Sequence, residues 1–246
     1  MRRKWIESYL RKRGLCIASI EPAPAGIPPN GPTLAAALER LKARAIPLGT
    51  VLDVGASDGR WSEQLLPYYP TSRYLCVEAQ PAHEPALKKF TADHPNIEFV
   101  LAAAGASQGS IYFNASDLFG GVASTKPVGD VCITVPVTTL DAEVKRRSLP
   151  PPYLIKLDTH GFEVPILSGA AETLVNSAIL IIEAYNFQIT DGSLYFHELC
   201  RHLGTKGFRC IDLFDPLYRP SDGALWQVDL MFARGDRPEF QNKKYQ

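Results

Sequence analysis

Apolar residues recur along the chain in two alternating patterns, short aliphatic runs and longer segments with apolar positions three or four residues apart. The first pattern is typical of strands and the second of amphipathic helices. We predict strands over 50–54, 73–77, 97–102, 153–158, 178–183, 208–213 and 226–233, and helices over 61–68, 85–93, 164–175 and 197–206. Strands alternating with helices of this length imply right-handed βαβ crossovers. The sequence therefore predicts an α/β fold with a doubly wound, mainly parallel sheet.

Two segments depart from this alternation. Between residues 109 and 140 the pattern changes to short alternating runs at 110–114 and 131–137, separated by glycines and a proline, which predicts an inserted antiparallel excursion. Residues 21–32 carry five prolines and two glycines, which favours a linker. After it, Thr33 can cap a helix with one apolar face that covers the main domain. We predict an N-terminal helical extension with its Pro-rich linker over 1–46 and a main domain over 47–246.

Composition excludes several classes of function. The chain has 246 residues, of which 46% are hydrophobic, and its 26 basic and 26 acidic side chains balance. No net field recruits nucleic acid, although residues 1–13 are locally basic. No apolar run is long enough to span a membrane, and no secretory signal is present, so the cytoplasm is expected. The five cysteines include no CxxC pair, which favours free thiols over zinc.

The first candidate site lies where the strand 50–54 ends. Its last residues continue into the turn Asp53-Val54-Gly55-Ala56-Ser57-Asp58-Gly59. Glycines in such a turn let the chain bend sharply and let a ligand approach bare backbone. Glu78 ends the next strand, where a carboxylate can accept hydrogen bonds from both hydroxyls of a ribose. Together these residues predict a nucleoside-binding cradle.

Two kinds of cofactor present a ribose, and the turn separates them. Dinucleotide-binding turns normally read GxGxxG because a pyrophosphate needs close approach at the middle glycine. Ser57 stands at that position here. The acidic Asp53 suits the cationic amino group of a methionine moiety better than a diphosphate. S-adenosyl-L-methionine is therefore favoured, and an NAD(P)-dependent oxidoreductase is the alternative.

The second candidate site follows the strand 153–158. The run Ile155-Lys156-Leu157-Asp158-Thr159-His160-Gly161-Phe162-Glu163 gathers four charged or titratable side chains at a predicted strand end. With the Asp53 turn, the Glu78-Ala79-Gln80-Pro81 run and Ile182-Glu183, this segment resembles the FkbM family of methyltransferases. The resemblance covers residues 51–183. One departure is His160, which stands where the family commonly has Glu or Gln.

The resemblance implies a class I, Rossmann-like methyltransferase fold with an antiparallel last strand. It also implies methyl transfer from S-adenosyl-L-methionine to a hydroxyl oxygen of a small molecule, sugar or natural product. The candidate cofactor-binding residues are Asp53, Gly55, Ala56, Ser57, Gly59, Glu78, Ala79 and Ala103. Asp158 and His160 are the candidate catalytic residues, because neutral His160 can act as a base that Asp158 orients.

Several alternatives stay open. No metal is expected, but Asp158, Glu183 and Asn186 are the oxygen ligands that could hold a divalent cation with a diol acceptor. Lys156 is expected to pair with Glu183, and Glu163 to cap the following helix. The other four histidines, at 83, 94, 197 and 202, are expected to be solvated or at the core edge. A catalytically silent cofactor-binding protein and a homo-oligomer are both compatible with the sequence.

Overall fold

The computed structural model describes residues 31–244, in which seven strands form the main sheet. These strands are β1 (Thr50–Val54), β2 (Arg73–Glu78), β3 (Ile97–Leu101), β8 (Tyr153–Leu157), β9 (Ser177–Tyr185), β10 (Phe208–Tyr218) and β11 (Leu225–Arg234). Their order is β10-β11-β9-β8-β1-β2-β3. The strands from β3 to β9 run parallel, whereas β11 is antiparallel to both neighbours. The expected doubly wound, mainly parallel sheet with an antiparallel last strand is confirmed.

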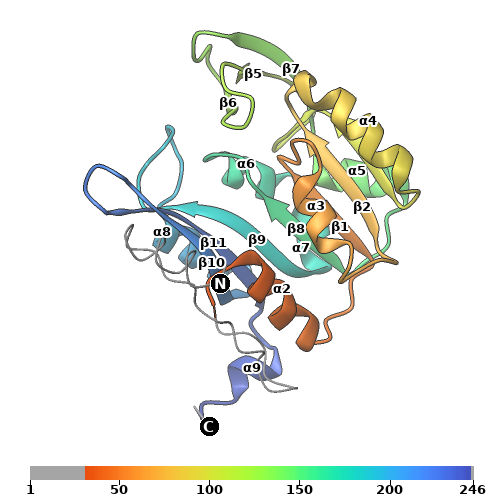
Figure 1. The fold of residues 1–246 in the computed structure, drawn as a ribbon, viewed down its shortest axis with the longest axis vertical. Coiled ribbons are helices and arrows are strands. Elements are labelled where there is room, and N and C mark those ends of the chain that lie inside the picture. Colours follow the sequence, from red (N-terminus) through yellow and green to blue (C-terminus); the bar gives the residue numbers. More distant parts are fainter. Residues whose placement is uncertain (1–30, 245–246) are drawn as a thin grey trace, which may run out of the picture.

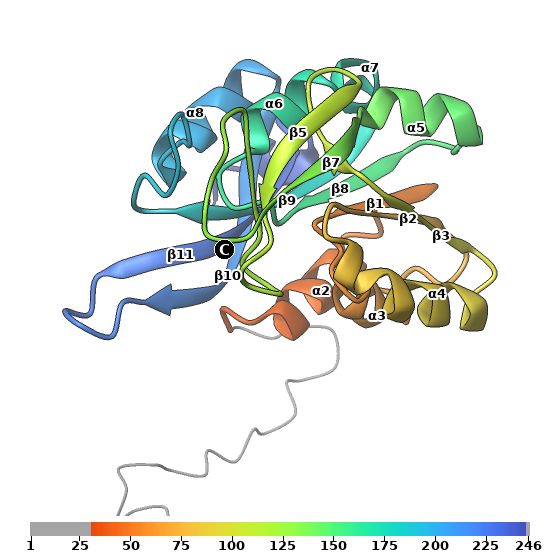
Figure 2. The same ribbon diagram turned by 90° about the horizontal axis from the view of Figure 1, so that it is seen from above.

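Helices cover both faces of this sheet (Figure 1, Figure 2). One face carries α2 (Leu34–Ala43), α3 (Arg60–Leu65) and α4 (Glu84–Asp93), and the other carries α5 (Leu140–Arg147), α6 (Glu163–Ser168), α7 (Ala171–Val175) and α8 (Phe196–Thr205). The 3₁₀ helix η1 (Pro81–His83) precedes α4, and α9 (Pro238–Gln241) lies near the C-terminus. Covering both faces explains why β1 and β8 are buried along their whole length.

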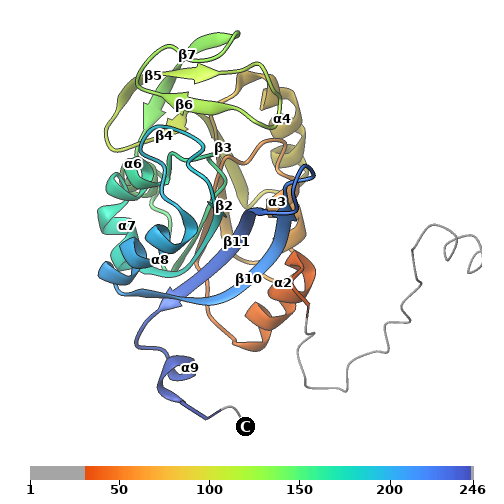
Figure 3. The same ribbon diagram turned by 90° about the vertical axis from the view of Figure 1, so that its left-hand side faces the viewer.

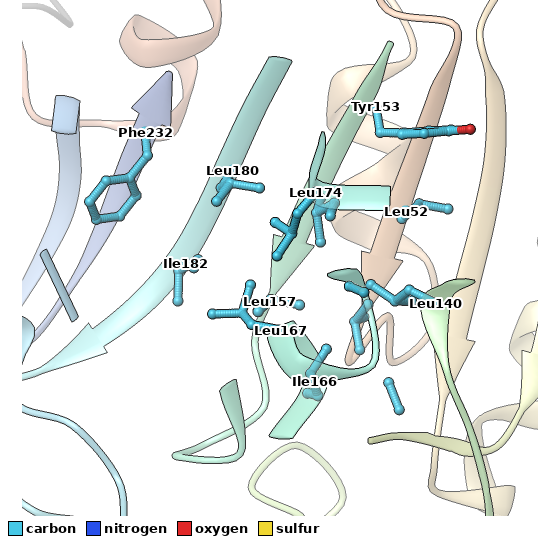
Figure 4. Close-up of a cluster of buried hydrophobic side chains, with 14 of the residues drawn as sticks. Leu52, Leu140, Tyr153, Leu157, Ile166, Leu167, Leu174, Leu180, Ile182 and Phe232 are labelled. Carbon is cyan, nitrogen blue, oxygen red and sulfur yellow. The ribbon is translucent and has the colours of Figure 1, made fainter. Parts of the chain in front are cut away.

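Alternate residues of each strand feed two separate hydrophobic layers. Leu52 and Leu157 point toward the α5–α8 side, where they pack with Ile166 and Leu167 (Figure 4). Their neighbours in the sequence pack on the α2–α4 side, as Val51 does. This period of two follows from the pleat of a strand.

A second, smaller sheet stands over the carboxyl ends of the main strands (Figure 3). It contains β4 (Ala103–Ala104), β7 (Cys132–Thr138), β5 (Gly109–Asn114) and β6 (Val122–Ser124), in that order. Strands β5 and β7 pair antiparallel, which confirms the expected excursion. The amide of Gly105 donates to the carbonyl of Thr138 at 2.9 Å, so the excursion leaves and rejoins the main domain at one place.

The structure corrects three predicted elements. The single helix over 164–175 is wrong, because the chain breaks at Gly169 into α6 and α7. A side chain at Gly169 would lie 2.0 Å from the carbonyl oxygen of Gly105, so close packing fixes this break. Helix α3 ends at Leu65 rather than at residue 68. Strand β10 continues five residues beyond the predicted end, passing a register shift between Phe214 and Leu217 at the sheet edge.

Helix α2 begins as predicted. The side chain of Thr33 accepts the amide of Ala36, and the guanidinium of Arg40 donates to Asp212 on β10 at 2.7 Å. The basic segment 1–13 and most of the Pro-rich linker 21–32 lie outside the described residues, as does Cys16. None of the helices within 31–244 is long and apolar enough to cross a membrane.

Candidate functional site

A cavity of about 330 Å³ opens at the carboxyl ends of β1, β2 and β8. This is the point where the strand order reverses, between β1 and β8, and open α/β sheets bind ligands at such switch points. Apolar residues form most of its walls. Phe113 on β5 and Leu118 and Phe119 in the loop between β5 and β6 line it from the small sheet's side. The volume lies in the range of pockets that enclose small molecules.

The turn after β1 forms the floor of this cavity. Gly55 has a φ of +74°, and a Cβ added there would lie 1.9 Å from the carbonyl oxygen of Asp158. Ser57 also has a positive φ, of 53°. The turn is thus pressed against the loop that follows β8, and only glycine allows that approach at residue 55.

Glu78 joins the two loops that border the cavity. One carboxylate oxygen accepts the amide of Ser57 at 2.7 Å, and the other accepts the amide of Gln80 at 2.7 Å. A carboxylate has lone pairs for further donors, so ribose hydroxyls can still bind. The amide of Ser57, which a dinucleotide site would turn toward a pyrophosphate, is already committed to Glu78.

The structure separates the candidate cofactor residues into two groups. Those that line the cavity are Gly55, Ala56, Ser57, Glu78, Ala79 and Ala103. Asp53 and Gly59 lie behind this wall. Asp53 is fully buried, where it accepts the hydroxyl of Ser62 at 2.7 Å. A side chain at Gly59 would collide with the ring of Phe90, so this glycine lets the turn pack against α4.

Lys156 connects this buried carboxylate to the opposite end of the cavity. Its ammonium nitrogen lies 3.5 Å from Asp53 and 3.1 Å from Asp158. The expected pairing of Lys156 with Glu183 is therefore wrong. Register explains the difference, because Lys156 stands directly opposite Asp53 on the neighbouring strand β1. Although burial opposes ionisation, the nearby ammonium of Lys156 lowers the pKa of Asp158.

His160 faces the cavity from the loop after β8. Its φ is 49°, and its Nδ1 lies 3.0 Å from the carbonyl oxygen of Gly121 in the small sheet's loop. A carbonyl only accepts, so Nδ1 carries the proton and the Nε2 of the neutral ring keeps a lone pair. Nε2 lies 3.7 Å from Asp158 and 3.8 Å from Glu183. The loop thus brings the two candidate catalytic residues together at one wall.

A family model described as a methyltransferase FkbM domain matches residues 53–210, which is more than half of the chain. The chain belongs to the FkbM methyltransferase family. The resemblance noted in the sequence is therefore confirmed. The comparison with curated proteins gives no match.

One solved structure shows the same fold, and two others are similar in part. A methyltransferase FkbM from Methylobacillus flagellatus KT is 18% identical with a TM-score of 0.50, and the alignment covers 75% of this chain and 43% of that chain. A candidate O-methyltransferase from Klebsiella pneumoniae is 11% identical with a TM-score of 0.49, over 94% and 89%. A precorrin-6y C5,15-methyltransferase from Geobacter metallireducens GS-15 is 13% identical with a TM-score of 0.43, over 82% and 87%. This chain spans less than half of the Methylobacillus protein.

Glu183 is a largely buried carboxyl group next to Asp158 and His160 in this FkbM-family site. Burial, and then the charge of Asp158, raise its pKa to about 8. One of its oxygens accepts the hydroxyl of Tyr185, and the other accepts the side-chain amide of Gln227. The side-chain amide of Asn186 instead donates to the carbonyl of Leu225 at 3.3 Å. The atoms of Asp158, His160 and Glu183 lie within 4.8 Å of one another.

Sequence reasoning missed His83. This residue is not solvated, since only 4% of it is exposed, and it lines the cavity beside Ser57. Its Nε2 lies 2.8 Å from the carbonyl oxygen of Leu118 and 3.4 Å from the Ser57 hydroxyl. His83 therefore connects the turn after β1 to the loop between β5 and β6. Its position shortly after Glu78 could have signalled this, because loops at strand carboxyl ends carry the site.

Glu163 is the first residue of α6, but the expected capping of this helix is wrong, because the N-cap is Phe162 and no side chain caps the helix amides. Its carboxylate accepts the amide of Gly161 at 2.9 Å, which stabilises the loop before α6. Burial raises its pKa above the ordinary value. It supports the conformation that presents His160 rather than facing the cavity itself.

Proposed function

We propose that this protein transfers the methyl group of S-adenosyl-L-methionine to the hydroxyl oxygen of a small molecule, such as a sugar or a natural product. The observation that supports it best is one continuous cavity, lined by Glu78 and the Gly55–Ser57 turn as well as by His160 and Asp158. The membership of the FkbM methyltransferase family supports the reaction class.

The cofactor would bind against the turn after β1. Glu78 would accept the ribose hydroxyls, while Gly55, Ala56, Ser57, Ala79 and Ala103 would line the nucleoside and methionine parts. Asp53 and Gly59 would act from behind the wall, by fixing the shape of the turn. When bound, S-adenosyl-L-methionine supplies a methyl group activated by its sulfonium. Its positive charge suits a cavity whose polar walls include Glu78 and Asp158.

The acceptor would approach between the loop after β8 and the small sheet. Methyl transfer is an in-line displacement, so orienting the hydroxyl oxygen is the protein's main contribution. The Nε2 of neutral His160 has a lone pair that can accept the hydroxyl proton, and Asp158 can hold the acceptor or stabilise the imidazolium. The carbonyl of Gly121 fixes the tautomer that this requires.

Titration of the purified protein with three ligands tests the cofactor. We expect S-adenosyl-L-methionine and its demethylated product to bind in a calorimeter, and NAD to produce no heat. Binding of NAD alone would identify an oxidoreductase instead. The committed Ser57 amide is the structural reason to expect the first result.

Methyl labelling tests the reaction. The protein is incubated with cofactor carrying a labelled methyl group and with extracts of its source, and the labelled product is identified. A methyl ether in the product supports transfer to oxygen, whereas label on nitrogen or carbon excludes it. His160→Asn should bind the cofactor normally and lose about 10²–10⁴-fold in turnover, the usual contribution of a positioned acid or base. Equal turnover would exclude the base role, and a wild type that binds cofactor without transferring methyl to any acceptor would favour a silent protein.

Two further assignments belong to this proposal. We place the reaction in the cytoplasm, which the free thiols of Cys76, Cys132, Cys200 and Cys210 support. We also keep residues 47–246 as the methyltransferase domain and 1–46 as its extension. Helix α2 packs on β10 through Arg40 and Asp212, so cleavage after residue 46 should lower the melting temperature of the domain.

A further inference from the structure

His160 and Asp158 at the cavity wall each have one polar atom held from outside and another that faces inward, and the carboxylate of Glu183 lies beside them. Gly121 holds Nδ1 of His160, which leaves Nε2 facing inward. Lys156 holds Oδ2 of Asp158 at 3.1 Å, which leaves Oδ1 facing His160. Tyr185 and Gln227 fix the carboxylate of Glu183, whose Oε2 also faces His160.

The inward nitrogen of His160 makes no hydrogen bond with either carboxyl group. The Nε2 of His160 lies 3.7 Å from Oδ1 of Asp158 and 3.8 Å from Oε2 of Glu183, which is too far for a hydrogen bond. With the tautomer set by Gly121, the Nε2 of His160 offers a lone pair to the two carboxyl groups. Three acceptors that face each other repel unless a proton or a metal cation lies between them.

The surrounding charges do not supply this positive charge. The neighbouring carboxyl groups are those of Asp53, Asp158, Glu183 and Asp229. Lys156 contributes one ammonium to this group, and Asp53 and Asp158 both pair with it. Glu183 lies opposite Asp229 in the register of β9 and β11, so its nearest partner strand adds a further acid.

We propose that Asp158 Oδ1, His160 Nε2 and Glu183 Oε2 bind a divalent cation. Two carboxylates and one imidazole suit Mn²⁺ or Mg²⁺, with the imidazole favouring the transition metal. The far atoms of His160, Asp158 and Glu183 are held by a carbonyl, an ammonium and a side-chain amide. Outer partners of this kind orient the ligands in protein metal sites. The site differs from the oxygen set expected from the sequence, because His160 takes the place of Asn186.

The ligand atoms need to approach one another only slightly. Neighbouring ligands of an octahedral cation lie about 3 Å apart. His160 lies 3.7 and 3.8 Å from the two carboxylates, and all three ligand atoms lie within 4.8 Å of one another. Asp158 is 38% exposed at its side chain and can rotate inward. Three protein ligands leave other positions for solvent or for an acceptor oxygen.

The cation would change how the acceptor loses its proton. A hydroxyl bound to a divalent cation ionises more readily, as metal-bound water does. The lone pair on Nε2 would then bind the cation instead of accepting the acceptor's proton. This part of the inference rests on the proposed function, whereas cation binding itself does not.

Binding of Mn²⁺ to the full chain, without cofactor or acceptor, tests the site. We expect a dissociation constant well below about 1 mM, the weak limit of protein cation sites, from the loss of the free Mn²⁺ electron paramagnetic resonance signal. Pulsed measurements should detect the ¹⁴N nucleus of an imidazole coupled to the bound ion. His160→Asn should abolish this coupling, because asparagine tolerates the positive φ but has no imidazole.

Matched variants separate ligands from their surroundings. Glu183→Gln and Asp158→Asn should weaken Mn²⁺ binding more than tenfold, and Tyr185→Phe about tenfold, since loss of an outer partner costs 10–100-fold in affinity. Asp191→Asn removes an exposed carboxylate from the loop after β9 and should bind Mn²⁺ like the wild type. Circular dichroism confirms that each variant is folded.

The inference is overturned by weak binding near 1 mM that all variants share, or by a bound ion with no nitrogen coupling. Either result would leave a proton rather than a cation among the three atoms. Methyl transfer can then still occur, with His160 as the base. Conversely, tight Mn²⁺ binding without methyl transfer would support the site and contradict the proposed function.

Discussion

The ammonium nitrogen of Lys156 lies 3.5 Å from Oδ1 of Asp53, a buried atom that receives no hydrogen bond within the described chain. The same nitrogen lies 3.1 Å from Asp158. The buried ammonium of Lys156 therefore neutralises one carboxylate beneath the turn after β1 and another on the loop after β8. The two halves of the site depend on one side chain.

Replacing Lys156 should destabilise the whole domain. Lys156→Met should lower the free energy of unfolding by about 3–5 kcal/mol, because removing one partner leaves a buried charge uncompensated. Urea denaturation measures this loss. Adding Asp53→Asn to the same chain should restore part of it. A loss below about 1 kcal/mol would show that this pair behaves like an exposed one.

Gly55→Ala should abolish cofactor binding and lower the melting temperature. The new Cβ would lie 1.9 Å from the carbonyl oxygen of Asp158, so the turn or the loop after β8 must move. Gly192→Ala is the matched control, since its φ is also positive, at +83°, but its Cβ meets open space. Similar melting temperatures for both variants would show that backbone strain, and not the close approach, matters at residue 55.

Glu78→Gln should weaken S-adenosyl-L-methionine binding about tenfold, which corresponds to ~1.4 kcal/mol. The amide of glutamine would keep one acceptor but lose the charge that attracts the ribose hydroxyls and orders the Ser57 and Gln80 amides. Calorimetric titration gives the affinity. Glu84→Gln, on the exposed side of α4, should bind as the wild type does. An unchanged affinity in Glu78→Gln would remove Glu78 from the cofactor site.

Glu143 should make stability depend on acid pH. Burial raises its pKa, but hydrogen bonds from Thr138 and Arg146 and the charge of Arg147 outweigh this and lower it. Its contribution is therefore present above the unfolded value of about 4.5 and is lost as the pH falls through the lower folded value. Glu143→Gln should cost more stability at neutral pH than at about pH 3, as measured by urea unfolding. An equal cost at both values would contradict the lowered pKa.

The order of strands and helices could be predicted because burial on both faces makes each central strand an apolar run. The loops after β1 and β8 could also be located, since ligands gather at strand carboxyl ends. The break at Gly169 could not, because it depends on Gly105, which is distant in the sequence. The partner of Lys156 likewise depends on which strands are neighbours, and local spacing does not contain that information.

The roles of the polar side chains needed coordinates for a related reason. His83 and His160 are similar in the sequence, each shortly after a strand. Only the structure shows that both reach carbonyls of the small sheet's loop, at Leu118 and Gly121. Hydrogen bonds to backbone carbonyls have no sequence signature, because every residue has one.

The small sheet begins and ends at neighbouring residues of the main domain, which bears on how the cavity wall can change. Because Gly105 and Thr138 are joined by a hydrogen bond, the chain leaves the main domain for the small sheet and returns to it at one place. A segment with this topology can be lengthened or replaced without new strand pairing in the main sheet. A change in this segment would alter the cavity wall that Phe113, Leu118 and Phe119 form, while the strands beneath it keep their pairing.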